Sequence, residues 1–172
     1  MTNYDEDPSV ENEIVDLEIV IDRPVSQVWN KWMDLSSWVT SHDIEQVAGT
    51  RDAVGGITRV SYRAAKEIGP PPPHYHYNKV IHVVPEKQYV LKSYAEKGGS
   101  YGQYFIGFDE TRFYAMDGKT RVSFRFFGHS QGAADVVVKN PDKAKEFANV
   151  PHMQMNLENL KRLLESEPRI KE

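Results

Sequence analysis

The sequence predicts an α+β fold in which an antiparallel sheet packs against one long helix near the C-terminus. Between a short helical segment and that last helix, nearly every segment alternates apolar and polar residues, as half-buried strands do. Tight turns separate consecutive strands, and short connections join antiparallel neighbours. The last helix has one apolar face, so helix and sheet can each bury the apolar face of the other.

The first elements are a strand and a tryptophan-rich helix. A strand is expected over 13–22, where apolar side chains alternate with acidic ones. Pro24 suits the first turn of the helix that follows, because a first-turn residue needs no backbone N–H. Trp29 and Trp32 share the apolar face of this helix, and Trp38 follows in a short second helical piece. These large side chains indicate an extensive apolar contact at this end of the domain.

The middle of the chain is predicted to form consecutive strands separated by turn-forming residues. The expected strands lie near 57–64, 75–84, 88–95, 101–116 and 120–127. The strongest hairpin signal is Asp117-Gly118, because this dipeptide favours a two-residue turn. Asp109-Glu110 is a candidate turn or bulge within the segment 101–116.

The last helix is expected from about Asn140 to Ser166. Asn140 is a good N-cap, and apolar residues at spacings of three and four follow from Met153 to Leu164. Pro151 should kink or split the helix, since it removes one backbone hydrogen bond. We therefore expect 141–150 to form a separable, lid-like segment whose motion at the kink admits a ligand, next to a fixed helix that starts at His152.

Three stretches resemble the START/Bet v 1-like superfamily, which includes polyketide cyclases and Hsp90-activator-like domains. They are Ile19–Trp38, the hairpin Asp117–Val122 and the terminal helix. The resemblance implies a helix-grip fold, in which a curved sheet wraps around the C-terminal helix and leaves a cavity between them. The three stretches frame residues 13–166, and a chain of 172 residues is most simply one domain. We expect a disordered tail at 1–12 and a C-terminal tail at 167–172.

Alternation along the strands predicts which side chains would line that cavity. If Lys92 points outward, Tyr89, Leu91 and Ser93 point inward. If Arg121 and Arg125 point outward, Phe124 and Phe126 point inward. The register of the family that the sequence resembles favours an inward orientation of Tyr77, Ile81 and Val83. The predicted ligand-binding residues are Trp32, Trp38, Tyr77, Tyr89, Leu91, Phe124, Phe126, Met153, Asn156 and Leu157. The alternative is that these side chains simply fill a core.

Composition excludes several classes of function. The 172 residues carry 21 Lys and Arg against 25 Asp and Glu, a formal charge of −4, without a long basic run. A nucleic-acid partner is therefore not expected. No apolar run is long enough for a membrane span. Cysteine is absent and the first residues are acidic and polar, which fits a cytoplasmic protein without disulfides or a secretory signal.

Candidate catalytic groups are few. His74, His76 and His82 share a strand parity, but no cysteine or evident carboxylate accompanies them, so we expect no metal and no cofactor. His76 and His152 are candidate general acids or bases, but no other feature of the sequence supports such a role. Signature motifs of nucleophilic hydrolases, P-loop proteins and dinucleotide-binding proteins are absent.

Three hypotheses about function follow. The first is a protein that binds a small hydrophobic molecule in an internal cavity. The second is a cofactor-free polyketide cyclase, aromatase or lyase that uses tyrosine hydroxyls in the same cavity. The third is an interaction protein that resembles Hsp90 activators. The sequence predicts no particular oligomeric state.

Overall fold

The computed structural model describes residues 10–40, 42–62, 76–97, 100–129 and 150–170. Within them, the chain forms one antiparallel sheet in the order β1-β7-β6-β5-β4-β3-β2. The helices are α1 (Val25–Met33), the short 3-10 helix η1 (Leu35–Ser37) and α5 (Val150–Ser166). The strands are β1 (Val10–Ile21), β2 (His42–Ala48), β3 (Ile57–Tyr62), β4 (His76–Val84), β5 (Gln88–Lys97), β6 (Ser100–Met116) and β7 (Lys119–His129).

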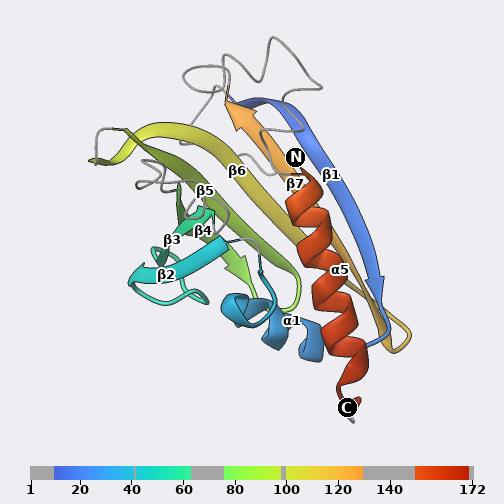
Figure 1. Ribbon diagram of the computed structural model, residues 1–172. Coiled ribbons are helices and arrows are strands. Elements are labelled where there is room, and N and C mark those ends of the chain that lie inside the picture. The colour runs from blue at the N-terminus through green and yellow to red at the C-terminus, as the bar shows by residue number, and fades with distance from the viewer. Residues whose placement is uncertain (1–9, 41, 63–75, 98–99, 130–149, 171–172) are drawn as a thin grey trace.

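The sheet is strongly curved, and α5 lies along its concave side with α1 at one end (Figure 1). This confirms the predicted α+β helix-grip architecture. The sequence did not predict β2, which pairs with β3 at the edge of the sheet. Most of β2 is exposed, so it lacks the apolar alternation that identifies a half-buried strand.

Aromatic side chains fill the end of the molecule near α1. The ring of Trp29 meets Phe113 edge-on with 5.2 Å between centroids, and Trp32 packs against Trp38 at 4.8 Å. We call this group the packed floor; it consists of Trp29, Trp32, Trp38, Tyr89, Phe113 and Val122, all of them buried. The predicted apolar contact of the tryptophans is therefore confirmed.

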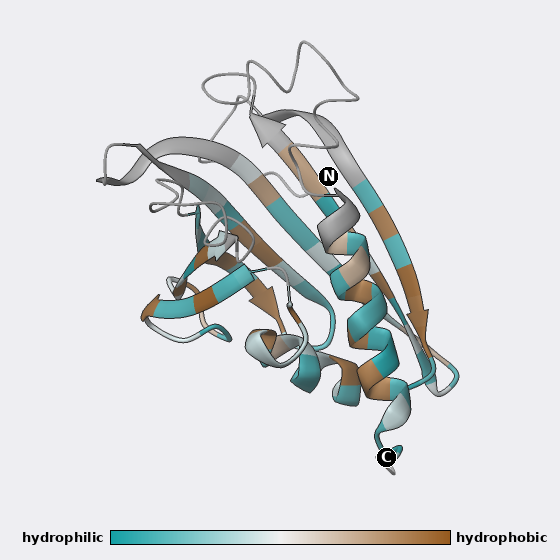
Figure 2. Ribbon diagram, viewed as in Figure 1, coloured by the Kyte–Doolittle hydropathy of each residue, from teal (hydrophilic) through white to brown (hydrophobic). Residues whose placement is uncertain are grey.

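The apolar face of α5 closes the core. Leu157, Leu160 and Leu164 are at most 2% exposed and belong to the same cluster as the packed floor. Figure 2 shows apolar bands on α5 and the strands alternating with hydrophilic ones. Pro151 is the second residue of the described helix, where its missing N–H breaks no helical hydrogen bond. The predicted segment 141–149 lies outside the described residues, so the lid remains a prediction.

Two of the irregularities in strand pairing concern the predicted orientation of side chains. The pairing of β4 with β5 shifts between Val80 and His82, which makes Ile81 an extra residue in β4. The pairing of β5 with β6 shifts next to Gly107, whereas β6 continues without interruption through Asp109-Glu110. The turn or bulge expected at Asp109-Glu110 is therefore wrong.

Glycine at position 107 is required by the close approach of two strands. A Cβ atom there would lie 2.1 Å from the carbonyl oxygen of Phe127 and 2.9 Å from Cζ of Phe126. The contact with the Phe127 oxygen is far shorter than a real Cβ makes, and the contact with Phe126 is just below the usual limit of 3.0 Å. A side chain at this position would therefore force β6 away from β7.

Residues 165–170 bind back onto the start of the domain, and we call these contacts the C-terminal clasp. The Arg23 guanidinium donates to the carbonyl oxygens of Glu165 at 2.6 Å and Glu167 at 2.7 Å. The Gln27 side chain donates to the Pro168 carbonyl oxygen at 3.0 Å. The bond to Glu165 gives a carbonyl group in the last turn of α5 a partner, and the bonds to Glu167 and Pro168 hold the residues that follow the helix.

Candidate ligand-binding site

The candidate site lies on the concave face of the central strands, beyond the packed floor. Cross-strand partners in an antiparallel sheet share a face, so Phe124 lies on the face of Thr111 and Leu17. Phe124 and Phe126 of β7, Leu91 of β5 and Met153 of α5 are all half-buried, in contrast to the floor. We call these four residues the half-buried wall. Apolar side chains that keep exposed surface on the inner face of a sheet are incompletely packed.

Nine of the ten predicted ligand-binding residues lie on this inner side, in two different environments. Trp32, Trp38, Tyr89 and Leu157 are buried in the core. Leu91, Phe124, Phe126 and Met153 form the half-buried wall. Asn156 is buried, and its Oδ1 accepts a hydrogen bond from the backbone N–H of Thr40 at 3.2 Å. The predicted inward orientation of the alternating residues in β5 and β7 is confirmed.

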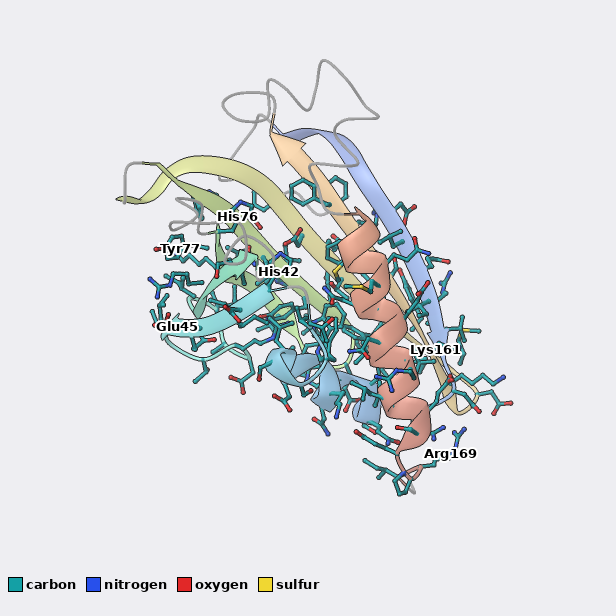
Figure 3. All side chains as sticks on the ribbon, in the orientation of Figure 1. His42, Glu45, His76, Tyr77, Lys161 and Arg169 are labelled. Atoms are coloured by element: carbon teal, nitrogen blue, oxygen red, sulfur yellow. The ribbon has the colours of Figure 1, made fainter. Side chains whose placement is uncertain are left out.

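Tyr77 lies on the opposite face of the sheet, so its predicted inward orientation is wrong. It pairs with Tyr94 of β5 and Arg59 of β3, while its neighbour Asn78 pairs with Ser93 on the inner face. Figure 3 shows Tyr77 on the side of the sheet away from α5. The cause is the bulge at Ile81: Val83 points inward as predicted, but the extra residue reverses the parity that relates it to Tyr77.

Tyr89 uses its hydroxyl group in a contact with the loop after β2. The hydroxyl donates to the carbonyl oxygen of Arg51 at 2.7 Å, and the Arg51 guanidinium lies 5.1 Å from the ring centroid. Burial raises the pKa of the Tyr89 hydroxyl and lowers the pKa of the Arg51 guanidinium. The Arg51 guanidinium also reaches the carbonyl oxygen of Trp32 at 3.4 Å, at the end of α1. These contacts make Tyr89 a structural residue of the floor.

A polar row crosses the inner face beside the wall, and the sequence predicted the inward position of only one of its members, Ser93. The row consists of Asn78 of β4, Ser93 of β5 and Asp109 of β6. The Ser93 hydroxyl oxygen lies 2.8 Å from Oδ1 of Asn78 and 3.2 Å from Oδ2 of Asp109. Asp109 pairs with Leu91 on one side and Phe126 on the other, so apolar wall residues flank the carboxyl group.

Burial raises the pKa of Asp109 to about 7, and the hydrogen bond from Ser93 opposes this rise. Burial disfavours the charged form of a carboxyl group when no cation compensates it. Near neutral pH the group therefore exchanges readily between a proton donor and a carboxylate. The alternation of 109, 111 and 113 was a signal for an inward carboxyl group, but the expected turn at Asp109-Glu110 obscured it.

Glu110, the next residue, is also buried, but its carboxylate lies next to cationic side chains. It is 3% exposed, yet its Oε1 lies 2.5 Å from Nε of Arg112 and 3.9 Å from a guanidinium nitrogen of Arg125. It lies on the outer face, opposite Val90. Two arginines thus compensate the charge of Glu110, whereas Asp109 has only the Ser93 hydroxyl among its described partners.

Two histidines extend the inner face toward its edge. His76 pairs with Val60, which in turn pairs with Ile44, and His42 follows at the next inward position of β2 (Figure 3). Within the described ranges, no three His, Asp or Glu side chains are close enough to hold a metal ion. His74 lies outside them. No helix in the described part of the chain combines the length and apolar character needed to cross a membrane.

Comparison with solved structures places this architecture among known folds. A protein of Chromobacterium violaceum superposes with a TM-score of 0.64 at 16% identity, over 91% of this chain and 100% of that one. Ara h 8.0201 superposes with a TM-score of 0.62 at 14% identity, over 89% and 97% of the two chains. The chain has the helix-grip fold of Bet v 1-like proteins.

A third helix-grip structure is larger than this chain. DynU16, described as a putative protein in the dynemicin biosynthetic locus, superposes with a TM-score of 0.58 at 15% identity. The match covers 88% of this chain and 47% of DynU16. No protein-family model and no curated protein matches the sequence. At such identities the likeness establishes the fold, and function has to be argued from the site.

Proposed function

We propose that the chain binds a small, largely apolar molecule against the half-buried wall, between the strands of the sheet and α5. The observation that carries this proposal is the contrast along one face of the sheet. The packed floor is buried, with Val122 at 0% exposure, whereas Phe124 and Phe126 on the same strand keep accessible surface. Transferring such surface from water to a ligand releases about 25 cal/mol per Å².

The binding hypothesis is better supported than the tyrosine-based enzyme. Of the two tyrosines expected in the cavity, Tyr77 lies on the outer face. Tyr89 lies in the floor and donates its hydroxyl hydrogen to Arg51 at 2.7 Å. A hydroxyl group that stabilises a developing oxyanion has to be directed at the reacting oxygen. Neither tyrosine meets this condition in the described structure.

Titration with ethylnaphthalene, followed by the fluorescence of the ligand, tests the proposal. We expect saturable binding, and we expect Phe124→Asp or Met153→Asp to weaken it at least about tenfold, because each places a charge against the apolar ligand. Tyr114→Asp is the matched control, since Tyr114 is exposed on the outer face of β6. Circular dichroism establishes that each variant is folded. Unchanged affinity in the folded Phe124 and Met153 variants would contradict the proposal.

A further inference from the structure

We propose that Asp109 is the polar anchor of this site and that the preferred ligand carries a carbonyl oxygen, which accepts a hydrogen bond from the protonated carboxyl group. This inference rests on the proposed function, because it names the ligand class of the same site. It starts from a feature that packing alone does not require: a carboxyl group on the inner face of a central strand, between Leu91 and Phe126.

The contacts of Asp109 with the described residues leave one carboxyl oxygen for a ligand. Oδ2 of Asp109 lies 3.2 Å from the Ser93 hydroxyl oxygen, and no contact of Oδ1 is described. The Ser93 hydroxyl has two acceptors within reach, Asn78 Oδ1 and Asp109 Oδ2. Because it carries one hydrogen, it donates to only one of them at a time. When that hydrogen points at Oδ2, a proton on Oδ1 is free to be donated to a ligand.

The surroundings favour a neutral acid over a carboxylate. The groups that β5, β7 and α5 turn toward this region are uncharged, among them Leu91, Ser93, Phe124, Phe126, Met153 and Asn156. Among the side chains that the structure describes, the other titratable groups on the inner face of the strands are His42, His76 and Tyr89, with Arg51 packed on the Tyr89 ring at the floor. An apolar ligand would exclude water and favour the neutral carboxyl further, in agreement with the raised pKa of Asp109.

A carbonyl ligand fits this environment better than an amine. A ketone accepts from a neutral carboxyl without placing any charge in the site. A bound ammonium group would require an ionised Asp109, and burying both ions carries a large desolvation cost. A hydrocarbon would leave the carboxyl hydrogen without an acceptor, so it should bind more weakly than a ketone of the same shape.

Two ligands of nearly the same shape test the anchor: acetylnaphthalene, which has the carbonyl group, and ethylnaphthalene, which lacks it. At about pH 6 we expect the ketone to bind about tenfold more tightly, as one additional hydrogen bond would give. This preference should fall above about pH 7 as the carboxyl proton is lost. In Asp109→Asn it should persist at every pH, because the amide donates without titrating.

Two further variants separate the anchor from its neighbours. Asp109→Leu should abolish the preference for the ketone while ethylnaphthalene still binds. His76→Asn should retain the pH dependence, because His76 is a different titratable group on the same face. If Asp109→Leu does not fold, Asp109→Asn alone tests the anchor. A preference for the ketone that still falls with rising pH in Asp109→Asn would overturn the role of Asp109.

Each remaining outcome has a definite meaning. Equal affinity for ketone and hydrocarbon in the unmodified protein at about pH 6 overturns the anchor and leaves the apolar site standing. Tighter binding of naphthylethylamine as the pH rises would replace the carbonyl ligand by a cationic one. Absence of binding by all three compounds overturns the proposed function together with the anchor.

Discussion

Asp109 and Glu110 are consecutive residues whose carboxyl groups lie in different chemical environments. Alternation along β6 places Asp109 on the inner face, where Ser93 is its described partner, and Glu110 on the outer face with Arg112 and Arg125. The sequence contains this alternation, and a correct strand prediction would have revealed it. The pKa of Asp109 also depends on how densely other elements cover it, which no local pattern specifies.

Asp109→Asn should change how stability depends on pH. The folded-state pKa of Asp109 is about 7 and the ordinary value is 3.8, so between these values the unfolded chain binds fewer protons than the folded one. The unmodified protein therefore loses stability relative to the variant as the pH rises from about 4 to 7, and the difference is constant above that. We expect the variant to be more stable by roughly 2 to 4 kcal/mol at about pH 8.

Urea unfolding of both proteins across this pH range measures the difference directly. The comparison cancels the contributions of all other titrating groups, because they are the same in both proteins. A stability difference that is the same at about pH 4 and pH 8 would show that burial does not raise the pKa of Asp109.

At the scale of secondary structure, the sequence predicted elements more reliably than their irregularities. The tryptophan-bearing helix, the hairpin at Asp117-Gly118 and the leucine face of α5 follow from local patterns, and the structure contains all three. The orientation of Tyr77 depends on the bulge at Ile81, and a bulge leaves no clear trace in the alternation of one strand. The edge strand β2 is too exposed to show the pattern at all.

The C-terminal clasp makes Arg23 important for the position of α5. Arg23→Ala removes the donors to the carbonyl oxygens of Glu165 and Glu167, so these groups lose their described partner. We expect the free energy of unfolding to fall by about 2 kcal/mol. In thermal unfolding this corresponds to a decrease in Tm of roughly 4 to 8 °C for a chain of this size.

Arg121→Ala is the control for the Arg23 variant. In the unmodified protein the Arg121 guanidinium pairs with the Glu18 carboxylate at 3.2 Å, and both side chains are partly exposed. Such surface pairs contribute at most about 1 kcal/mol to the free energy of unfolding. Equal Tm values for the Arg23 variant and the unmodified protein would show that the clasp does not hold the end of α5.

The shape of the whole molecule depends on strands that bend together around α5. β6 is 17 residues long and follows the full curvature of the sheet (Figure 1). Gly107 lies where its pairing with β5 shifts and where the backbone of β7 comes close. The half-buried wall and the polar row both lie directly beyond this point, since Gly107 pairs with Ser93.

Gly107→Ala should disturb stability and binding together. The added Cβ would meet the Phe127 carbonyl oxygen at 2.1 Å, so β6 and β7 must separate or bend differently. We expect a loss of more than about 2 kcal/mol in the free energy of unfolding and a weaker affinity for ethylnaphthalene in the fraction that remains folded. Unfolding and binding measured on the same sample test this, and unchanged values of both would contradict it.

The separation between the packed floor and the half-buried wall also affects which positions can change during evolution without loss of stability. Trp32, Trp38 and Phe113 interlock edge-on or tilted, so most replacements there would cost stability. Replacements at Leu91, Phe124 or Met153 alter a surface that is already incompletely packed, and the core beneath should tolerate them. Related chains could therefore acquire new ligand preferences through a few neutral steps at the wall, while the tryptophan pair stays constant.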